Sequence, residues 1–312
     1  MSYFMSLNPL SLFRAMPGSI AQGMIWGVMA LGVYITFRLL DFADLTVDGS
    51  IATGAAVSVM LIRAGVSPIA TLPIAFLAGA LAGMVTGLLN TALGIPGILA
   101  SILTQISLYS INLNIMGKAN QPVSVDNYPL VVSLRYVTDG SVSRLLFFLG
   151  MIVFLLALIA VMYWYFGTEQ GHAIRATGCN GNMARAQGIN TNFIKVLALM
   201  ISNGLVGLCG ALYGQFQGAS DVNMGRGAIV IGLAAVIIGE ALFGKIFRNF
   251  GLRLLSVAFG SIIYYLVLQI VIWLGIDTDL LKLLSAAVVA IFLAIPTWKA
   301  RYFSMGSKGG KA

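Results

Sequence analysis

The sequence has 312 residues, of which 59% are hydrophobic and only 9% are charged. Soluble domains average roughly 45–50% apolar and about 25% charged residues, so this composition excludes a soluble enzyme or a soluble binding domain. About 184 apolar residues, at ~20 for each crossing, are enough for roughly nine transmembrane helices. The net charge of +8 points to the orientation of the chain in a lipid membrane and not to nucleic-acid binding, because Lys and Arg concentrate on the cytoplasmic side.

Long apolar runs separated by short polar breaks predict an all-α polytopic membrane protein with about 8–10 transmembrane helices. Helix is the expected conformation, because an open strand would leave backbone groups unpaired in hydrocarbon. We expect the whole chain, 1–312, to form a single transmembrane domain. Its spans are predicted near residues 18–40, 50–64, 68–90, 95–116, 145–166, 194–213, 227–243, 254–275 and 280–297.

Four segments outside these runs set the orientation. Residues 1–17 are predicted to be an interfacial segment lying on the membrane, or else a short extra insertion. Placing the loop 167–193 in the cytoplasm makes 117–144 an extracytoplasmic loop and 299–312 a cytoplasmic tail, and it puts ten Lys and Arg residues inside. Nine spans would then start the chain outside, unless the N-terminal segment inserts.

The most polar interruption of the apolar part is residues 41–50, with three carboxylates between two apolar runs. Ionisable groups are costly in lipid and usually face a cavity, a partner or the interface. In an extended segment, alternation would put four polar side chains on one face, with Asp48 or Ser50 capping a helix that starts near Ile51. The segment is either a broken helix that lines a solute path in the core or a cytoplasmic turn. The four candidates are Asp44, Thr46, Asp48 and Ser50.

A second polar stripe follows Gly94-Ile95-Pro96-Gly97. Ser101, Gln105 and Asn112 fall on a single face of the predicted helix. Such a stripe lines a pore or makes hydrogen bonds between helices, and the pattern fits both interpretations equally.

The loop 167–193 predicts a compact helical segment at the membrane surface. A first short helix over Gly171–Met183 contains a turn at 178–181, and a second ends at Gly188. Asn190 is the expected N-cap of the following span. This knob is suited to docking in a groove of another protein, whereas a plain solvated loop would contain fewer Ala, Met and Ile residues.

At this loop the sequence resembles the permease subunits of bacterial ABC importers for branched-chain amino acids and, more distantly, for ribose-type sugars. The family has a three-part pattern in this loop: G-[RH]-A-[IL]-R-A, then A after seven residues, then G-I-N. It aligns without gaps with Gly171–Ala176, Ala184 and 188–190. Residues 44–50 are similar to a sugar-permease motif with Asp48 inserted, and residues 94–96 and 98–101 are similar to the family segment before a core helix. The run 40–50 also resembles a subgroup labelled as tryptophan/tyrosine-type permeases.

The resemblance implies a transport subunit of an importer in the bacterial cytoplasmic membrane. Its expected partners are ATP-binding-cassette ATPase subunits, an extracytoplasmic substrate-binding protein and a second permease as a homodimer or pseudo-dimer. The loop would be the ATPase-coupling segment, through Gly171, His172, Ile174, Arg175, Ala184, Arg185 and Gly188. The favoured solute is an amino acid, with an aromatic one suggested by the subgroup, and a sugar or a nucleoside is the alternative.

Neither a catalytic constellation nor a cofactor motif stands out, so we expect no enzyme and no cofactor in this chain. The run 239–246 nearly matches a phosphate-binding loop, but Ile246 stands where the magnesium-binding hydroxyl is needed. ATP and Mg²⁺ are therefore expected on the partner ATPase. A secondary transporter driven by an ion gradient is the competing class, although it gives no reason for the cytoplasmic knob.

Overall fold

The computed structural model describes residues 9–138, 141–247 and 249–274, together with the single positions 283, 286, 287, 290, 291 and 294. Helices dominate this part of the chain, which confirms the all-α prediction. They are α1 (Pro9–Tyr34), α2 (Thr46–Arg63), α3 (Pro68–Thr91), α4 (Gly97–Met116), α5 (Leu134–Thr138), α6 (Ser141–Phe166), α7 (Glu169–Cys179), α8 (Gly181–Ala186), α9 (Thr191–Gln217), α10 (Ala228–Phe243) and α11 (Phe250–Trp273). A π-helical turn, η2 (Ile35–Leu39), extends α1, and the strands β1 (Asn120–Pro122) and β2 (Ala219–Asp221) pair antiparallel with Gln121 opposite Ser220.

Six helices in the described part are long and apolar enough to cross a membrane, namely α1, α3, α4, α6, α9 and α11. The spans predicted at 50–64 and 227–243 correspond to α2 and α10, which pack inside the bundle. The last predicted span, 280–297, and the tail 299–312 lie outside the described residues, apart from isolated positions of the span. Residues 9–17 are the first turns of α1 and form no separate element.

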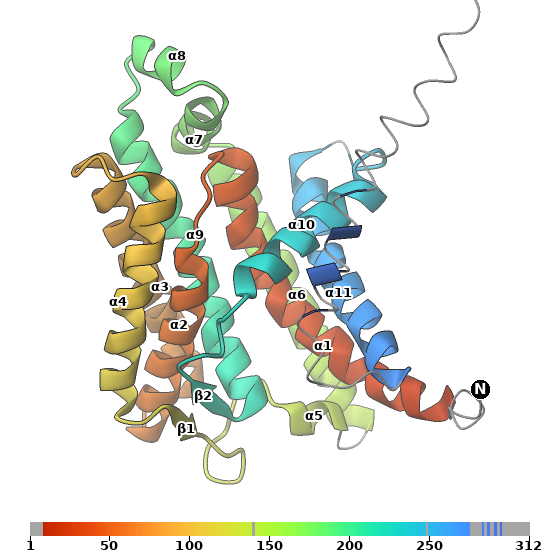
Figure 1. The fold of residues 1–312 in the computed structure, drawn as a ribbon. Helices are drawn as coiled ribbons and strands as arrows, with labels where there is room; N and C mark the ends of the chain where they lie inside the picture. The colour runs from red at the N-terminus through yellow and green to blue at the C-terminus, as the bar shows by residue number, and fades with distance from the viewer. Residues whose placement is uncertain are drawn as a thin grey trace, which may run out of the picture.

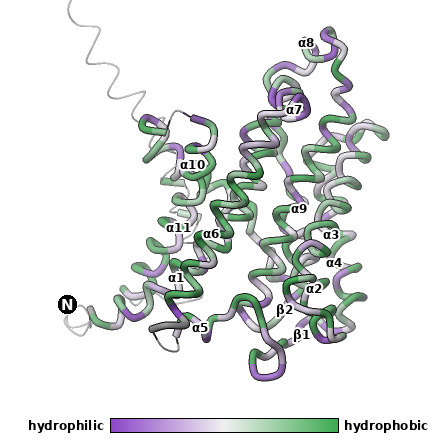
Figure 2. The backbone as a smooth tube through the Cα atoms, turned by 180° about the vertical axis from the view of Figure 1, so that it is seen from behind, coloured by the Kyte–Doolittle hydropathy of each residue, from purple (hydrophilic) through white to green (hydrophobic). Residues whose placement is uncertain are grey.

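The two ends of the bundle differ (Figure 1). Helices α7 and α8 form one end, whereas α5, β1, β2 and the start of α1 lie at the other. Figure 2 shows hydrophilic residues gathered at α7 and α8 and in the loop beside β1, with hydrophobic residues between them. Taking α7 and α8 as cytoplasmic places Pro9 on the outer side, as the count of spans predicts.

Helix α9 runs through the centre and packs on α1, α2 and α3. Glycine makes these contacts unusually close: a Cβ at Gly54 would collide with the carbonyl of Gly207, and one at Gly79 with the carbonyl of Asn203. Small residues let helix backbones approach in lipid, where no hydrophobic force drives helices together. Helices α2 and α3 are therefore fixed against α9 through their backbones.

The chain breaks between η2 and α2. Residues 41–44 are non-helical, and both α2 and α10 begin inside the bundle rather than at one of its ends (Figure 1). Residues 41–44 thus combine features of both predicted alternatives, with an exposed Asp41 beside α7 and a helix that starts inside the bundle, and the predicted extended register is wrong. Helix α2 starts at Thr46 instead of near Ile51, so the four polar side chains of 44–50 do not share one face.

Candidate functional site

Asp44 closes a hydrogen-bonded cluster between α2 and α9. Its Oδ1 accepts from the backbone N–H of Thr46 at 2.9 Å, and its Oδ2 accepts from Nδ2 of Asn203 at 2.6 Å. Ser50 donates to Oδ1 of the same Asn203 at 2.7 Å. Asp44 is 2% exposed and Ser50 is fully buried, so both side chains hold helices together and neither faces a cavity.

Thr46 belongs to a chain of hydroxyl groups that joins α2, α3 and α4. Its Oγ1 lies 2.7 Å from Oγ1 of Thr86, which donates to Oγ1 of Thr104 at 2.9 Å. All three residues are buried. Ser101 is buried as well, and its hydroxyl donates to the carbonyl of Ile98 at 2.9 Å. Interhelical and local hydrogen bonding therefore accounts for Thr46 and Ser101.

Asp48 points the other way and caps a different helix. Its Oδ2 accepts from the N–H of Gly227 at 3.0 Å and its Oδ1 from the N–H of Ile229 at 2.9 Å. These are unpaired N–H groups of the first turn of α10, where a carboxylate also meets the positive end of the helix dipole. The expectation that Asp48 or Ser50 caps α2 is thus wrong, because the cap that Asp48 provides lies about 180 residues away in sequence.

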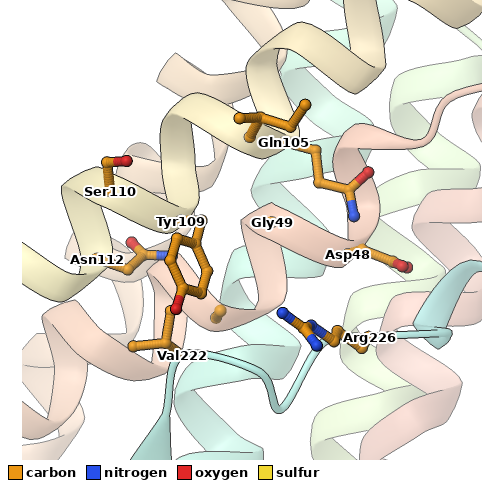
Figure 3. A pocket seen from close by; sticks show the side chains of 10 residues that line it. Asp48, Gly49, Gln105, Tyr109, Ser110, Asn112, Val222 and Arg226 are labelled. Atoms are coloured by element: carbon orange, nitrogen blue, oxygen red, sulfur yellow. The ribbon is translucent and has the colours of Figure 1, made fainter. Parts of the chain in front are cut away.

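A cavity of about 350 Å³ opens beside Asp48, where α2, α4 and the β2–α10 connection meet (Figure 3). This volume is within the range of roughly 300–1,000 Å³ found for small-molecule sites. Of the seven predicted path residues, Asp48, Gln105 and Asn112 line the cavity, and Asp44, Thr46, Ser50 and Ser101 do not. Its lining is Asp48, Gly49, Ala52, Gln105, Ile106, Tyr109, Ser110, Asn112, Val222 and Arg226.

Asn112 is the unusual member of this lining. Its side chain is fully buried, yet neither Oδ1 nor Nδ2 has a hydrogen-bond partner in the described part of the chain. A buried polar group without a partner costs about 1–3 kcal/mol, so native structures rarely keep one without a reason. The amide of Asn112 carries one donor group and one acceptor at the cavity wall, and a ligand would reach them once the neighbouring side chains move.

Arg226 is a charged lining residue that was not among the predicted path residues. No local pattern in the sequence places it beside residues 48 and 112. A usable signal was its position between Gly225 and Gly227, directly before an apolar run. Within the described residues it forms no ion pair with Asp48, although both line the same cavity.

The predicted coupling loop folds as two short helices, as expected. Asn180 caps α8 by accepting from the N–H groups of Asn182 and Met183, and Asn190 caps α9 by accepting from Phe193 N–H at 3.2 Å. Gly188 has a φ of +84°, the left-handed conformation that ends a helix. Local turn and cap residues thus predict two short helices, but the predicted bounds are wrong: α7 spans Glu169–Cys179 instead of Gly171–Met183, and Met183 belongs to α8.

The predicted coupling residues divide into buried and exposed sets. Gly171, Ile174 and Ala184 are buried and hold α7 and α8 in place. Arg185 donates to the hydroxyl of Thr191 at 2.7 Å, which ties α8 to α9. His172, Arg185 and Gly188 are exposed. The exposed face also includes residues outside the predicted set, namely Ala176, Met183 and Gln187.

Arg175 anchors α7 to the membrane helices. Its guanidinium carbon lies 4.0 Å from the ring centroid of Phe250 and 5.8 Å from that of Phe166, both cation–π distances. Burial lowers the pKa of this guanidinium, and the nearby Tyr34 partly opposes the shift. A Cβ at Gly178 would collide with the carbonyl of Leu39, so α7 also contacts the turn that leads to residues 41–50.

No group of three or more His, Cys, Asp and Glu side chains in the described part of the chain could hold a metal ion. The near match to a phosphate-binding loop is helical over 239–243, and Gly239 packs against Ser256 of α11. This packing leaves no room for a phosphate at that glycine.

Residues 16–295 match the family described as the branched-chain amino acid transport system permease component. The tyrosine transport system permease protein of Clostridioides difficile (strain R20291) is 39% identical over 275 residues, which cover 88% of this chain and 89% of the relative. The inner membrane ABC transporter permease protein YjfF of Escherichia coli (strain K12) is 27% identical over 218 residues, covering 69% and 64%. The autoinducer 2 import system permease protein LsrC of Yersinia pseudotuberculosis (serotype O:3, strain YPIII) is 30% identical over 216 residues, covering 68% and 58%. No solved structure matches this chain.

The described part of the chain is a helical bundle of a polytopic membrane protein, with a partly polar cavity beside Asp48. The chain belongs to the branched-chain amino acid/ribose-type permease family and is a permease subunit of an ABC importer. It is a multi-pass protein of the bacterial cytoplasmic membrane. The resemblance drawn from the coupling loop is confirmed.

Proposed function

We propose that this permease imports an amino acid, with an aromatic one favoured, along a path that passes the cavity beside Asp48. The observation that supports this solute most strongly is that the cavity is lined by both a carboxylate and a guanidinium. A sugar or a nucleoside would leave both charges without a partner of opposite sign. The relative named as a tyrosine permease adds support for an aromatic side chain.

The proposed assembly contains two permease copies, or one copy and a close relative, with ATPase subunits at α7 and α8. A substrate-binding protein would deliver the solute at the end that carries α5, β1 and β2. ATP and Mg²⁺ would bind to the ATPase subunits, and this chain would contribute no cofactor site.

Reconstitution in proteoliposomes tests the proposed function. With the ATPase and the binding protein present, uptake of radiolabelled tyrosine should require ATP and should persist when ionophores collapse proton and sodium gradients. Uptake that follows an ion gradient and ignores ATP would instead establish a secondary transporter. ATP-driven uptake of a sugar in preference to any amino acid would overturn the proposed solute.

Substitutions in α8 test the docking of the ATPase. Met183 is 63% exposed, so Met183→Glu should leave the fold intact and weaken ATPase binding through a charge in an apolar contact. We expect uptake and ATPase co-purification to fall by about tenfold, the equivalent of ~1.4 kcal/mol of binding. Met183→Leu is the matched control. Substituting Ala184 is a poorer test, because this residue is only 3% exposed and a larger side chain would distort α8 itself. Normal co-purification of the Met183→Glu variant would remove α8 from the docking surface.

A further inference from the structure

The cavity beside Asp48 has two poles of opposite charge, and they do not neutralise each other. The Asp48 carboxylate is fixed on the N–H groups of Gly227 and Ile229. The Arg226 guanidinium extends in the other direction, toward Tyr109 and Asn112 (Figure 3). No ion pair joins Asp48 and Arg226 in the described part of the chain, although both line the cavity. Because these two charges do not pair with each other, both are available to a ligand that carries a complementary anion and cation.

The amide side chains strengthen each pole. Asn112 is fully buried, its amide has no hydrogen-bond partner among the described residues, and it lies on the side toward which Arg226 extends (Figure 3). The amide of Gln105 lies on the Asp48 side (Figure 3). A carboxylate between Arg226 and Asn112 would accept from both. An ammonium near Asp48 would donate to the Asp48 carboxylate and, after the Gln105 amide rotates so that its oxygen replaces the nitrogen that faces Asp48 in Figure 3, to Gln105 as well.

The remaining lining is apolar or aromatic. Ala52, Ile106 and Val222 contribute carbon surface, and Tyr109 contributes a ring that is 43% exposed. An aromatic side chain of the ligand would pack against these groups. The cavity therefore combines one anion-binding pole, one cation-binding pole and an apolar wall.

On the basis of the proposed function, we infer that this cavity is a binding site for the zwitterionic backbone of an aromatic α-amino acid. Arg226 and Asn112 bind the carboxylate, and Gln105 and Asp48 bind the ammonium. Asp48 keeps its two backbone hydrogen bonds to α10, because a carboxylate has about four acceptor positions and these bonds use two. A ligand with a single charge would leave one pole without a partner.

Protection of an engineered thiol tests this site without relying on transport. Ser110 is exposed at the cavity, and Ser107 is an exposed serine of the same helix that does not line it. The variants Ser110→Cys and Ser107→Cys would be made in a Cys179→Ser background, because Cys179 is exposed whereas Cys209 is buried. Each full-length permease, purified with its ATPase, would be alkylated with a maleimide. The probes are L-tyrosine, tyramine and 3-(4-hydroxyphenyl)propionate at equal concentrations near the solubility limit of tyrosine.

Tyrosine should slow alkylation of the thiol at position 110 and should leave the thiol at position 107 unaffected. Tyramine lacks the carboxylate and the propionate lacks the ammonium, so each should protect about tenfold less effectively, as expected for the loss of one charged contact. Adding Arg226→Gln should abolish the difference between tyrosine and tyramine. This substitution is tolerable because Arg226 is exposed, and Arg135→Gln in the outer loop is its matched control.

Three results would overturn the zwitterion site. They are protection by tyramine equal to that by tyrosine, a preference for tyrosine over tyramine that survives Arg226→Gln, and no protection by tyrosine. A thiol at position 110 that forms a disulfide with a second copy and resists maleimide would also overturn it, because the permease partner would then fill the cavity. ATP-driven tyrosine uptake would be measured on the same preparation. If uptake is present and one of these results is found, the zwitterion site is wrong but the proposed function stands. If uptake is absent, the proposed function itself has failed.

Discussion

Asp44 and Asp48 lie four residues apart in the sequence but in regions of opposite character. Asp44 is 2% exposed and bound to Asn203 and to the backbone of Thr46, in a region where α2, α3 and α9 approach through glycine contacts. Asp48 belongs to α2, and its carboxylate binds the start of α10. It lies beside a cavity in which, among the described residues, Arg226 has no ion-pair partner and Asn112 has no hydrogen-bond partner.

This difference distinguishes polar groups that hold the bundle together from polar groups left for a ligand. In the closed region around Asp44, each side chain of the cluster has its partner, which stabilises the packed helices. In the open region around Asp48, donors and acceptors are left over, which costs stability and is typical of a functional site. Buried donors and acceptors without partners therefore indicate a solute path better than the presence of polar side chains does.

The largest expected effect on stability is at the closed region. Asn203→Leu removes the partner of both Asp44 and Ser50, and we expect a loss of about 2–3 kcal/mol because buried groups then remain unsatisfied. Thermal unfolding of the purified permease in detergent measures it. Asn114→Leu is the control, since Asn114 is exposed on α4 and should change stability by less than ~0.5 kcal/mol. Equal melting of the Asn203→Leu variant and the wild type would contradict the role of the cluster.

The next largest effect is at the open region. Asp48→Ala removes the cap of α10, which we expect to cost about 1–2 kcal/mol of stability. Tyrosine uptake should fall more than this loss of stability explains, by about tenfold. Asp48→Asn keeps an acceptor for one N–H group of α10, so it should recover part of the stability but not the uptake. If Asp48→Ala unfolds more readily than Asn203→Leu while transporting normally, the two regions have been assigned the wrong way round.

The smallest effect is expected at Asp126, an exposed carboxylate of the outer loop. A hydrogen bond from Arg135 lowers the pKa of Asp126. A carboxyl group with a lowered pKa in the folded protein stabilises the fold above its unfolded pKa of about 3.9, and this contribution disappears as the pH falls. Melting temperatures of the wild type and Asp126→Asn should therefore differ slightly at neutral pH and converge in acid. A large difference at neutral pH would show that exposed loop charges rival the buried clusters.

Local sequence predicted the two short helices of the predicted coupling loop and the cap at Asn190, although it placed the helix bounds wrongly. Turn residues at 178–181, the left-handed Gly188 and the cap at Asn190 act within a few residues, so their pattern is legible in one sequence. Whether a residue of this segment faces outward depends on the helices beneath it. Burial of Ile174 and Ala184 and the stacking of Arg175 on Phe250 could not be predicted for that reason.

The path region was predicted only in part. Composition marked residues 41–50 and the stripe on α4 as exceptional, and three of the seven chosen side chains do line the cavity. The others were indistinguishable in sequence because hydroxyl, amide and carboxylate groups suit a packed cluster as well as a path. Asp48 and Arg226 come together only because the connection after β2 returns into the bundle and starts α10 there.

Blocking the cavity tests the central claim, that solute passes Asp48 and not the cluster around Asp44. ATP-driven tyrosine uptake would be measured before and after a bulky maleimide modifies the thiol of Ser110→Cys, with Ser107→Cys as the control, both in the Cys179→Ser background. Modification at position 110 should stop uptake, and modification at position 107 should not. Unchanged uptake after complete modification at position 110 would contradict a path through this cavity.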